Sequence, residues 1–124
     1  MKILVVDDEE FIRTVAKKIL ERDGHEIILA ESGEEAVQVM RRSDGQIDLA
    51  LVDLTMDGLS GADTIVELRK LHPGLPVIIS SGRPVEDAEA PDTLVAETTY
   101  LQKPYRAKEL QLAVTVAATS RSEA

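Results

Sequence analysis

Cysteine is absent from the sequence, so disulfide bonds and thiolate chemistry are excluded. No apolar run approaches the length that spans a bilayer, and the start does not resemble a signal peptide, because acids follow a short β-branched run. Positive charge is scarce: 14 Lys and Arg against 23 Asp and Glu leave a formal net charge of -9. This balance disfavours direct binding to nucleic acid and insertion into membranes. We therefore expect a soluble, cytoplasmic protein that attracts cations or a basic partner surface.

Short apolar runs and amphipathic segments alternate along the chain, with no internal repeat and no low-complexity segment. The 124 residues suffice for one domain, expected over residues 1–119 and followed by a polar tail at 120–124. Apolar runs predict strands at residues 3–6, 27–30, 47–52, 76–80 and 100–101. Helical spacing predicts a first helix that ends before Gly24 and carries Phe11, Val15 and Ile19 on one face. Helical spacing and capping signals predict further helices at about 32–42, 61–71 and 106–119.

This alternation predicts an α/β fold in which helices cover both faces of a parallel sheet. In such sheets, ligands bind beyond the carboxyl ends of the strands, where the strand order reverses. Functional residues are therefore sought directly after each predicted strand. These positions hold Asp7 and Asp8, Ala30 and Glu31, Asp53, Ser80 and Ser81, and Lys103.

Three carboxylates of this set, Asp7, Asp8 and Asp53, are expected to converge at one end of the sheet. Each is ionised near neutral pH by its reference pKa, and a hard divalent cation would relieve their repulsion. An all-oxygen site with few carboxylates and room for water suits Mg²⁺ better than Ca²⁺. With a hydroxyl at Ser81 and an ammonium at Lys103, the set can hold a phosphoryl group. A carboxylate is then the plausible nucleophile, giving an acyl phosphate.

Each residue also has a purely structural interpretation. Asp7 or Asp8 can cap the helix that begins near Glu10, and Asp53 can be a turn residue. Ser81 alone is a loop hydroxyl, Lys103 alone is a solvated surface lysine, and Tyr100 alone is core filler. The occurrence of all these residues at strand ends of one predicted sheet favours the functional interpretation.

The blocks "ILVVDDEE", "DLALVDLTMDGLSG" and "VIISSG…YLQKPY", in this order and spacing, resemble the receiver domain of bacterial two-component response regulators over essentially the whole chain. The resemblance implies a flavodoxin-like, doubly wound sheet of five parallel strands in the order 2-1-3-4-5. The phrases "DLTMDGLSG" and "LQKPYRAKEL" are similar to receivers attached to hybrid sensor histidine kinases.

By position, the resemblance makes Asp53 the phospho-acceptor. It implies that Asp8 and Asp53 bind Mg²⁺ directly, that Asp7 contributes mainly through water, and that the backbone carbonyl of Thr55 completes the set.

The remaining motif residues concern the phosphoryl group and the switch. The resemblance makes Ser81, rather than Ser80, the switch hydroxyl, because it precedes a small residue. It makes Tyr100 the switch aromatic and Lys103 the lysine that pairs with the phosphate. The Lys103-Pro104 bond resembles the cis peptide of the family.

Two positions depart from the family pattern. Asp57 stands where proline is usual, which adds a negative charge to the loop after Asp53. Pro91 falls where the helix between the fourth and fifth strands should continue, and an interior proline breaks a helix. We therefore expect that fourth helix to be short or irregular.

The resulting hypothesis is a phospho-accepting receiver that takes a phosphoryl group from a phosphohistidine on a histidine kinase or phosphotransfer protein. It would then change the surface of its fourth helix, fifth strand and last helix, for a downstream protein target or a homodimer. Such a domain catalyses only its own phosphorylation and dephosphorylation. Two alternatives are a receiver-like binding module that is not phosphorylated and a metal-dependent phosphohydrolase. The latter needs a second acid two residues after the nucleophile, where this chain has Thr55.

Overall fold

A computed structural model describes residues 1–43, 46–54, 61–82 and 98–122. Strands and helices alternate as predicted over most of this range. Their order is β1 (Lys2–Val6), α1 (Glu10–Arg22), β2 (Glu26–Ala30), α2 (Gly33–Arg42), β3 (Leu49–Asp53), α3 (Gly61–Leu71), β4 (Val77–Ser81), β5 (Thr98–Gln102) and α4 (Ala107–Ser122). The helix expected between β4 and β5, together with Asp57 and Pro91, falls outside the described residues.

The five strands form one parallel sheet in the order β2-β1-β3-β4-β5, which confirms the predicted topology. Strand order reverses at β1, whose neighbours are β2 on one side and β3 on the other. The central strands are buried on both faces, as expected for the continuous apolar runs that form them. The carboxyl ends of β1 and β3 therefore lie side by side at the switch point.

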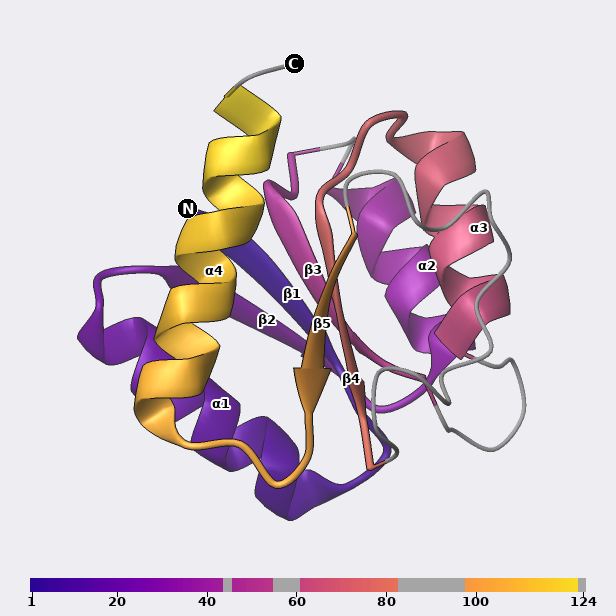
Figure 1. The fold of residues 1–124 in the computed structure, drawn as a ribbon. Helices are drawn as coiled ribbons and strands as arrows, with labels where there is room; N and C mark the ends of the chain where they lie inside the picture. Colours follow the sequence, from indigo (N-terminus) through magenta and orange to yellow (C-terminus); the bar gives the residue numbers. More distant parts are fainter. Residues whose placement is uncertain (44–45, 55–60, 83–97, 123–124) are drawn as a thin grey trace.

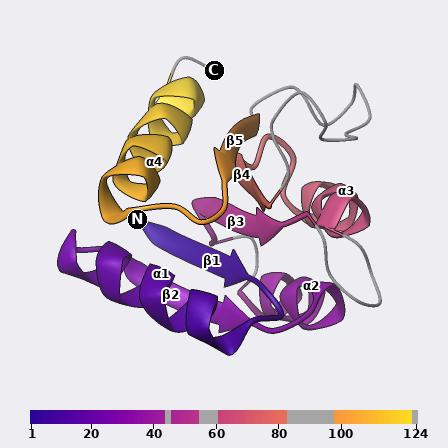
Figure 2. The same ribbon diagram turned by 60° about the horizontal axis from the view of Figure 1, so that its bottom comes forward.

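Two helical layers enclose the sheet (Figures 1 and 2). Helices α2 and α3 cover one face, where Met40, Ile65 and Leu68 pack on alternate residues of β1, β3 and β4. Helices α1 and α4 cover the other face, where Leu20 and Leu110 belong to a second buried cluster. Among the described residues, no helix is long and apolar enough to cross a membrane.

The predicted buried face of α1 is wrong at its start. Phe11 is 75% exposed, whereas Ala16 and Leu20 are fully buried. A helix turns by about 100° per residue, so Phe11 lies about 180° around the axis from Leu20. Once Ala16 and Leu20 face the sheet, the ring of Phe11 must face away from it.

Several element boundaries also differ from the predictions. Strand β3 begins at Leu49 rather than at residue 47, β4 extends to Ser81, and α4 continues to Ser122. The capping box of α2 is half formed. The Ser32 hydroxyl accepts a hydrogen bond from the Glu35 N–H at 3.1 Å, but the Glu35 carboxylate accepts from the N–H of Glu31 at 3.4 Å instead of from Ser32.

Candidate functional site

The acid cluster, which comprises Asp7, Asp8 and Asp53, forms at the carboxyl ends of β1 and β3. Val6 is paired with Val52 across these strands, so the residues that follow each of them are brought together. One carboxylate oxygen from each of the three residues lies within 4.8 Å of the others. Asp7 and Asp53 are 2% and 3% exposed, whereas Asp8 is open to solvent. The predicted convergence of three carboxylates is therefore confirmed.

The ammonium of Lys103 lies against this cluster. Its Nζ is 2.7 Å from Oδ2 of Asp7, 3.3 Å from Oδ2 of Asp53 and 3.9 Å from Oε1 of Glu9, and its side chain is 13% exposed. The backbone N–H of Lys103 donates to the carbonyl of Ser81 at 2.7 Å, which attaches the loop after β5 to the end of β4. Lys103 is thus a largely covered cation that pairs with two buried carboxylates, not a solvated surface lysine.

Burial by itself lowers the pKa of Lys103, because it disfavours the charged ammonium. The hydrogen bond to Asp7 and the charges of Asp53 and Asp7 act in the opposite direction, and the net result is a pKa raised above its ordinary value. Lys103 is therefore charged at neutral pH. The Lys103–Pro104 peptide bond is cis, as the resemblance implied.

The capping explanation for the two adjacent acids is not what the structure shows. Helix α1 has Glu9 at its N-cap, without a side-chain cap hydrogen bond. Asp7 instead accepts a hydrogen bond at its Oδ1 from the N–H of Glu9 at 2.9 Å, which closes a local turn. Within the described residues, the Asp8 carboxylate has no hydrogen-bond or ion-pair partner, so it is available to a ligand.

Ser81 and Tyr100 lie on the same face of the sheet. Tyr100 is paired with Ile79 and packs against the cluster beneath α2 and α3, and side chains alternate along a strand, so Ser81 shares the face of Ile79. Ser81 is the last residue of β4 and is 5% exposed, while Ser80, on the opposite face, is paired with Asp53. Thr55 lies outside the described residues.

Helix α3 begins in direct contact with the end of β3. The N–H of Gly61 donates to the carbonyl of Leu54 at 3.3 Å, and a Cβ at residue 61 would overlap the carbonyl oxygen of Asp53. Only glycine allows this close approach. The backbone of Asp53 is therefore held from one side by β4 and from the other by the start of α3.

The sequence analysis missed two residues beside the acid cluster. Arg13, in the first turns of α1, donates from Nη1 to the carbonyl oxygen of Asp7 at 2.7 Å. Tyr105 buries its hydroxyl, which has no hydrogen-bond partner among the described residues. Burial, and then the charges of Asp7 and Asp53, raise the pKa of this phenol well above its ordinary value. The sequence offered one signal for Tyr105, which directly follows the Lys-Pro pair. It offered no signal for Arg13, because a lone arginine on a helix usually indicates a solvated side chain.

The donor set of the acid cluster fits a hard divalent cation. All three side chains offer carboxylate oxygens, the ligands that Mg²⁺ prefers, and the exposed position of Asp8 leaves room for water molecules on the metal. Asp7, Asp8 and Asp53 would hold such an ion beside Lys103.

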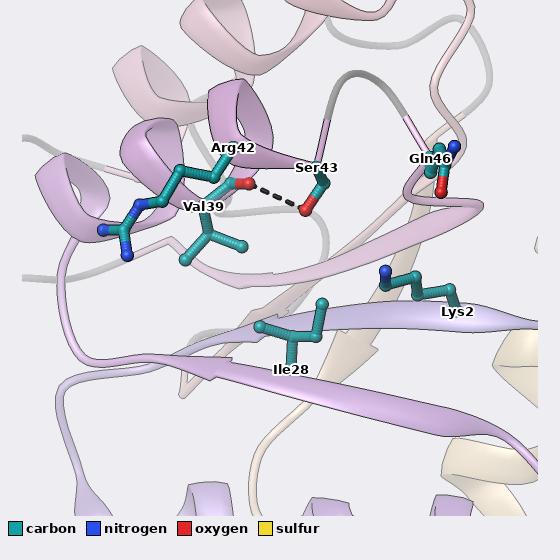
Figure 3. Close-up of a pocket in the computed structure, with 6 residues that line it drawn as sticks. All are labelled: Lys2, Ile28, Val39, Arg42, Ser43 and Gln46. Atoms are coloured by element: carbon teal, nitrogen blue, oxygen red, sulfur yellow. Dashed lines mark hydrogen bonds between the residues drawn. The ribbon is translucent and has the colours of Figure 1, made fainter.

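A separate pocket of about 460 Å³ lies at the other end of the sheet. Figure 3 shows its lining, which comprises Lys2, Ile28, Val39, Arg42, Ser43 and Gln46. Lys2 begins β1, whereas Asp7 follows its last residue, so this pocket and the acid cluster are at opposite ends of the strand. Arg42 is in the last turn of α2, where a cation complements the carbonyl end of the helix.

Comparison with known proteins identifies the family. The family described as "Response regulator receiver domain" matches residues 3–115. The transcriptional regulatory protein CpxR of Escherichia coli strain K12 is 36% identical over 109 residues, which cover 88% of this chain and 45% of CpxR. The sensor kinase CckA of Brucella abortus strain 2308 is 36% identical over 115 residues, covering 92% of this chain and 12% of that kinase.

A solved receiver structure agrees with this family assignment. The receiver domain of the hybrid histidine kinase CckA superposes with a TM-score of 0.82 at 30% identity, covering 95% of this chain and 99% of that one. The chain thus spans less than half of the length of the two curated relatives above, and it matches a separate receiver almost end to end. On these grounds, the chain belongs to the response regulator receiver domains of two-component systems.

Proposed function

We propose that this receiver accepts a phosphoryl group on Asp53 from a phosphohistidine of a histidine kinase or a phosphotransfer protein. The observation that supports it most is the convergence of three carboxylates and one largely covered ammonium at the switch point of the sheet. Receiver domains generally bind Mg²⁺ at an acidic pocket of this kind and interact with such kinases and with downstream effectors.

In the proposed reaction, a carboxylate oxygen of Asp53 attacks the phosphorus of the phosphohistidine. A P–O bond forms as the P–N bond breaks, and the histidine nitrogen leaves with the electron pair and takes up a proton. By the resemblance, Asp8 and Asp53 would hold a Mg²⁺ ion directly, Asp7 would contribute mainly through water, and the Thr55 carbonyl would complete the set. When bound, the ion would supply positive charge for the phosphoryl oxygens. The product is an acyl phosphate on Asp53.

Lys103 balances charge through this reaction. Its ammonium already contacts Asp53 at 3.3 Å, and a short movement would bring it to an oxygen of the attached phosphoryl group. Asp7, its closer partner at 2.7 Å, would keep the ammonium at the site during that movement.

The proposed response begins at Ser81. Its hydroxyl donates to the new phosphate, and Tyr100, on the same sheet face, moves into the space that the hydroxyl leaves. The surface of β5 and α4 changes with it. Leu112 and Val116 are 64% and 48% exposed on α4, so they present apolar side chains there for a downstream protein target or a second copy of the chain.

The test is intact mass after incubation with acetyl phosphate, with and without Mg²⁺. The wild type should gain a single Mg²⁺-dependent phosphoryl adduct that hydroxylamine removes, and Asp53→Asn should gain none. Asp23→Asn, the same substitution at an exposed position at the end of α1, is the matched control and should be modified like the wild type.

If the wild type shows no adduct, the acyl phosphate could have hydrolysed before the mass was measured, so its lifetime must be examined. Beryllofluoride, which mimics the attached phosphoryl group, should then bind in the presence of Mg²⁺. Failure of both experiments would favour the alternative of a receiver-like binding module that is not phosphorylated.

A further inference from the structure

Arg13 contacts the peptide group that joins two members of the acid cluster. Its Nη1 donates to the carbonyl oxygen of Asp7 at 2.7 Å, and this carbonyl belongs to the planar peptide unit between Asp7 and Asp8. The side chain of Arg13 is only 14% exposed, and its Nη2 lies 4.0 Å from Oε2 of Glu31 at the end of β2. A charge-assisted hydrogen bond therefore sets the plane of this peptide.

The orientation of Asp8 depends on that plane. Asp7 is held at three points: its N–H donates to Ala30 at 3.1 Å, its Oδ1 accepts from Glu9, and its Oδ2 pairs with Lys103. The Asp8 carboxylate has no such partner among the described residues. Rotation about the Cα–C bond of Asp7 would turn this peptide plane and carry Asp8 away from Asp53, and it would break the bond from Arg13 but no contact of the Asp8 side chain.

From these contacts we propose that Arg13 is a positioning residue, which holds the turn after β1 so that Asp8 faces Asp53 and the acid cluster binds Mg²⁺. This inference rests on the proposed function. The role is one of geometry, because the charge of the guanidinium acts against the binding of a second cation nearby.

The two effects of Arg13 have opposite signs, which makes the inference testable. If Arg13 acted only through its charge, Arg13→Met would bind Mg²⁺ more tightly, since a repelling cation is gone. If it positions Asp8, Arg13→Met should bind Mg²⁺ roughly tenfold more weakly, the lower end of the effect of removing a group that orients a metal ligand. Arg13→Lys keeps the charge but loses the fork of the guanidinium, so it should also bind Mg²⁺ more weakly than the wild type if Arg13 positions Asp8, and as well as the wild type if only the charge matters.

The experiment is a Mg²⁺ titration of the unphosphorylated protein, followed by the backbone amide signals of Asp8 and Glu9 in NMR spectra. Lys18→Met removes one exposed charge from the same helix, and Glu31→Gln removes the 4.0 Å ion pair but keeps the bond to Asp7. Both controls should stay within about twofold of the wild type, because exposed ion pairs contribute little.

A second measurement needs no metal. Amide hydrogen exchange at Asp8 and Glu9 should be several-fold faster in Arg13→Met than in the wild type in the presence of a chelator, while exchange in β3 stays unchanged. If Arg13→Met binds Mg²⁺ as well as or better than the wild type, or if exchange is unaltered, the positioning role is refuted. If the wild type itself binds no Mg²⁺, the metal part of the proposed function fails, and the exchange measurement still decides whether Arg13 holds the turn.

Discussion

Replacing Lys103 by methionine should destabilise the metal-free protein. Methionine preserves most of the length of the side chain, but Asp7 and Asp53 are left as two buried carboxylates without a cation. Removing one partner of a buried ion pair costs about 3–5 kcal/mol. Because Lys103 is 13% exposed and water can reach part of the site, we expect the free energy of unfolding to fall by about 3 kcal/mol, near the lower limit of that range.

Magnesium should reduce this loss. Lys103 and a divalent cation would neutralise the same carboxylates, so the variant should bind Mg²⁺ more tightly than the wild type. A tenfold gain in affinity would narrow the stability difference by about 1.4 kcal/mol at saturating Mg²⁺, because a ligand stabilises the state that binds it.

The assay is urea unfolding of both proteins at pH 7, with a chelator and with saturating Mg²⁺, beside the exposed-lysine control Lys18→Met. The control should stay within about 0.5 kcal/mol of the wild type. If Lys103→Met lowers the free energy of unfolding by less than about 1 kcal/mol in the chelator, the argument from unpaired buried carboxylates is refuted. If the stability difference from the wild type widens with Mg²⁺, the idea that Lys103 and Mg²⁺ neutralise the same carboxylates is refuted.

The direction of the pH dependence of the wild type follows from the same contacts. The pKa of Lys103 is raised in the folded protein above the unfolded reference of 10.5, so the folded state holds its proton more tightly. This stabilisation is fully present below that reference and is lost as the pH rises through the folded pKa. Lys103→Met should therefore lose stability less steeply than the wild type under alkaline conditions.

Two further variants test the packing around the acid cluster. Gly61→Ala should lower the free energy of unfolding, measured in urea, by about 1–3 kcal/mol and also slow phosphoryl uptake, since the new Cβ overlaps the Asp53 backbone. The control Ala62→Gly, one residue along α3, should change only the free energy of unfolding. Equal rates of phosphoryl uptake by the two variants would contradict the argument that only glycine allows the close approach. Tyr105→Phe should leave the free energy of unfolding unchanged or raise it by about 1 kcal/mol, because it removes a buried hydroxyl that has no hydrogen-bond partner among the described residues. A loss above about 1 kcal/mol in the same urea assay would mean that the hydroxyl does have a partner.

Local patterns of the sequence predicted an α/β fold with helices on both faces of a parallel sheet, whereas the strand order was predicted from the resemblance to receiver domains. The continuous apolar runs of β1, β3 and β4 indicate strands buried on both faces. The amphipathic helices predicted between successive strands return the chain to the same edge of the sheet, so the strands run parallel. Parallel strands place their carboxyl ends at one edge, so the positions of Asp7, Asp8 and Asp53 directly after runs of this kind already predict a cluster. Side-chain periodicity and chain direction are local properties, which is why they can be read without coordinates.

Only the tertiary structure decided which side chains neutralise the charges of the acid cluster and which contacts fix its backbone. Lys103 comes from the far end of the chain, and its choice of Asp7 as the closer partner depends on how the loop after β5 attaches to Ser81. The bond from Arg13 to Asp7 and the exposure of Phe11 both follow from how α1 is rotated about its axis on the sheet. These contacts join residues through packing rather than through spacing along the chain, and a packing geometry exists only once the layers have assembled.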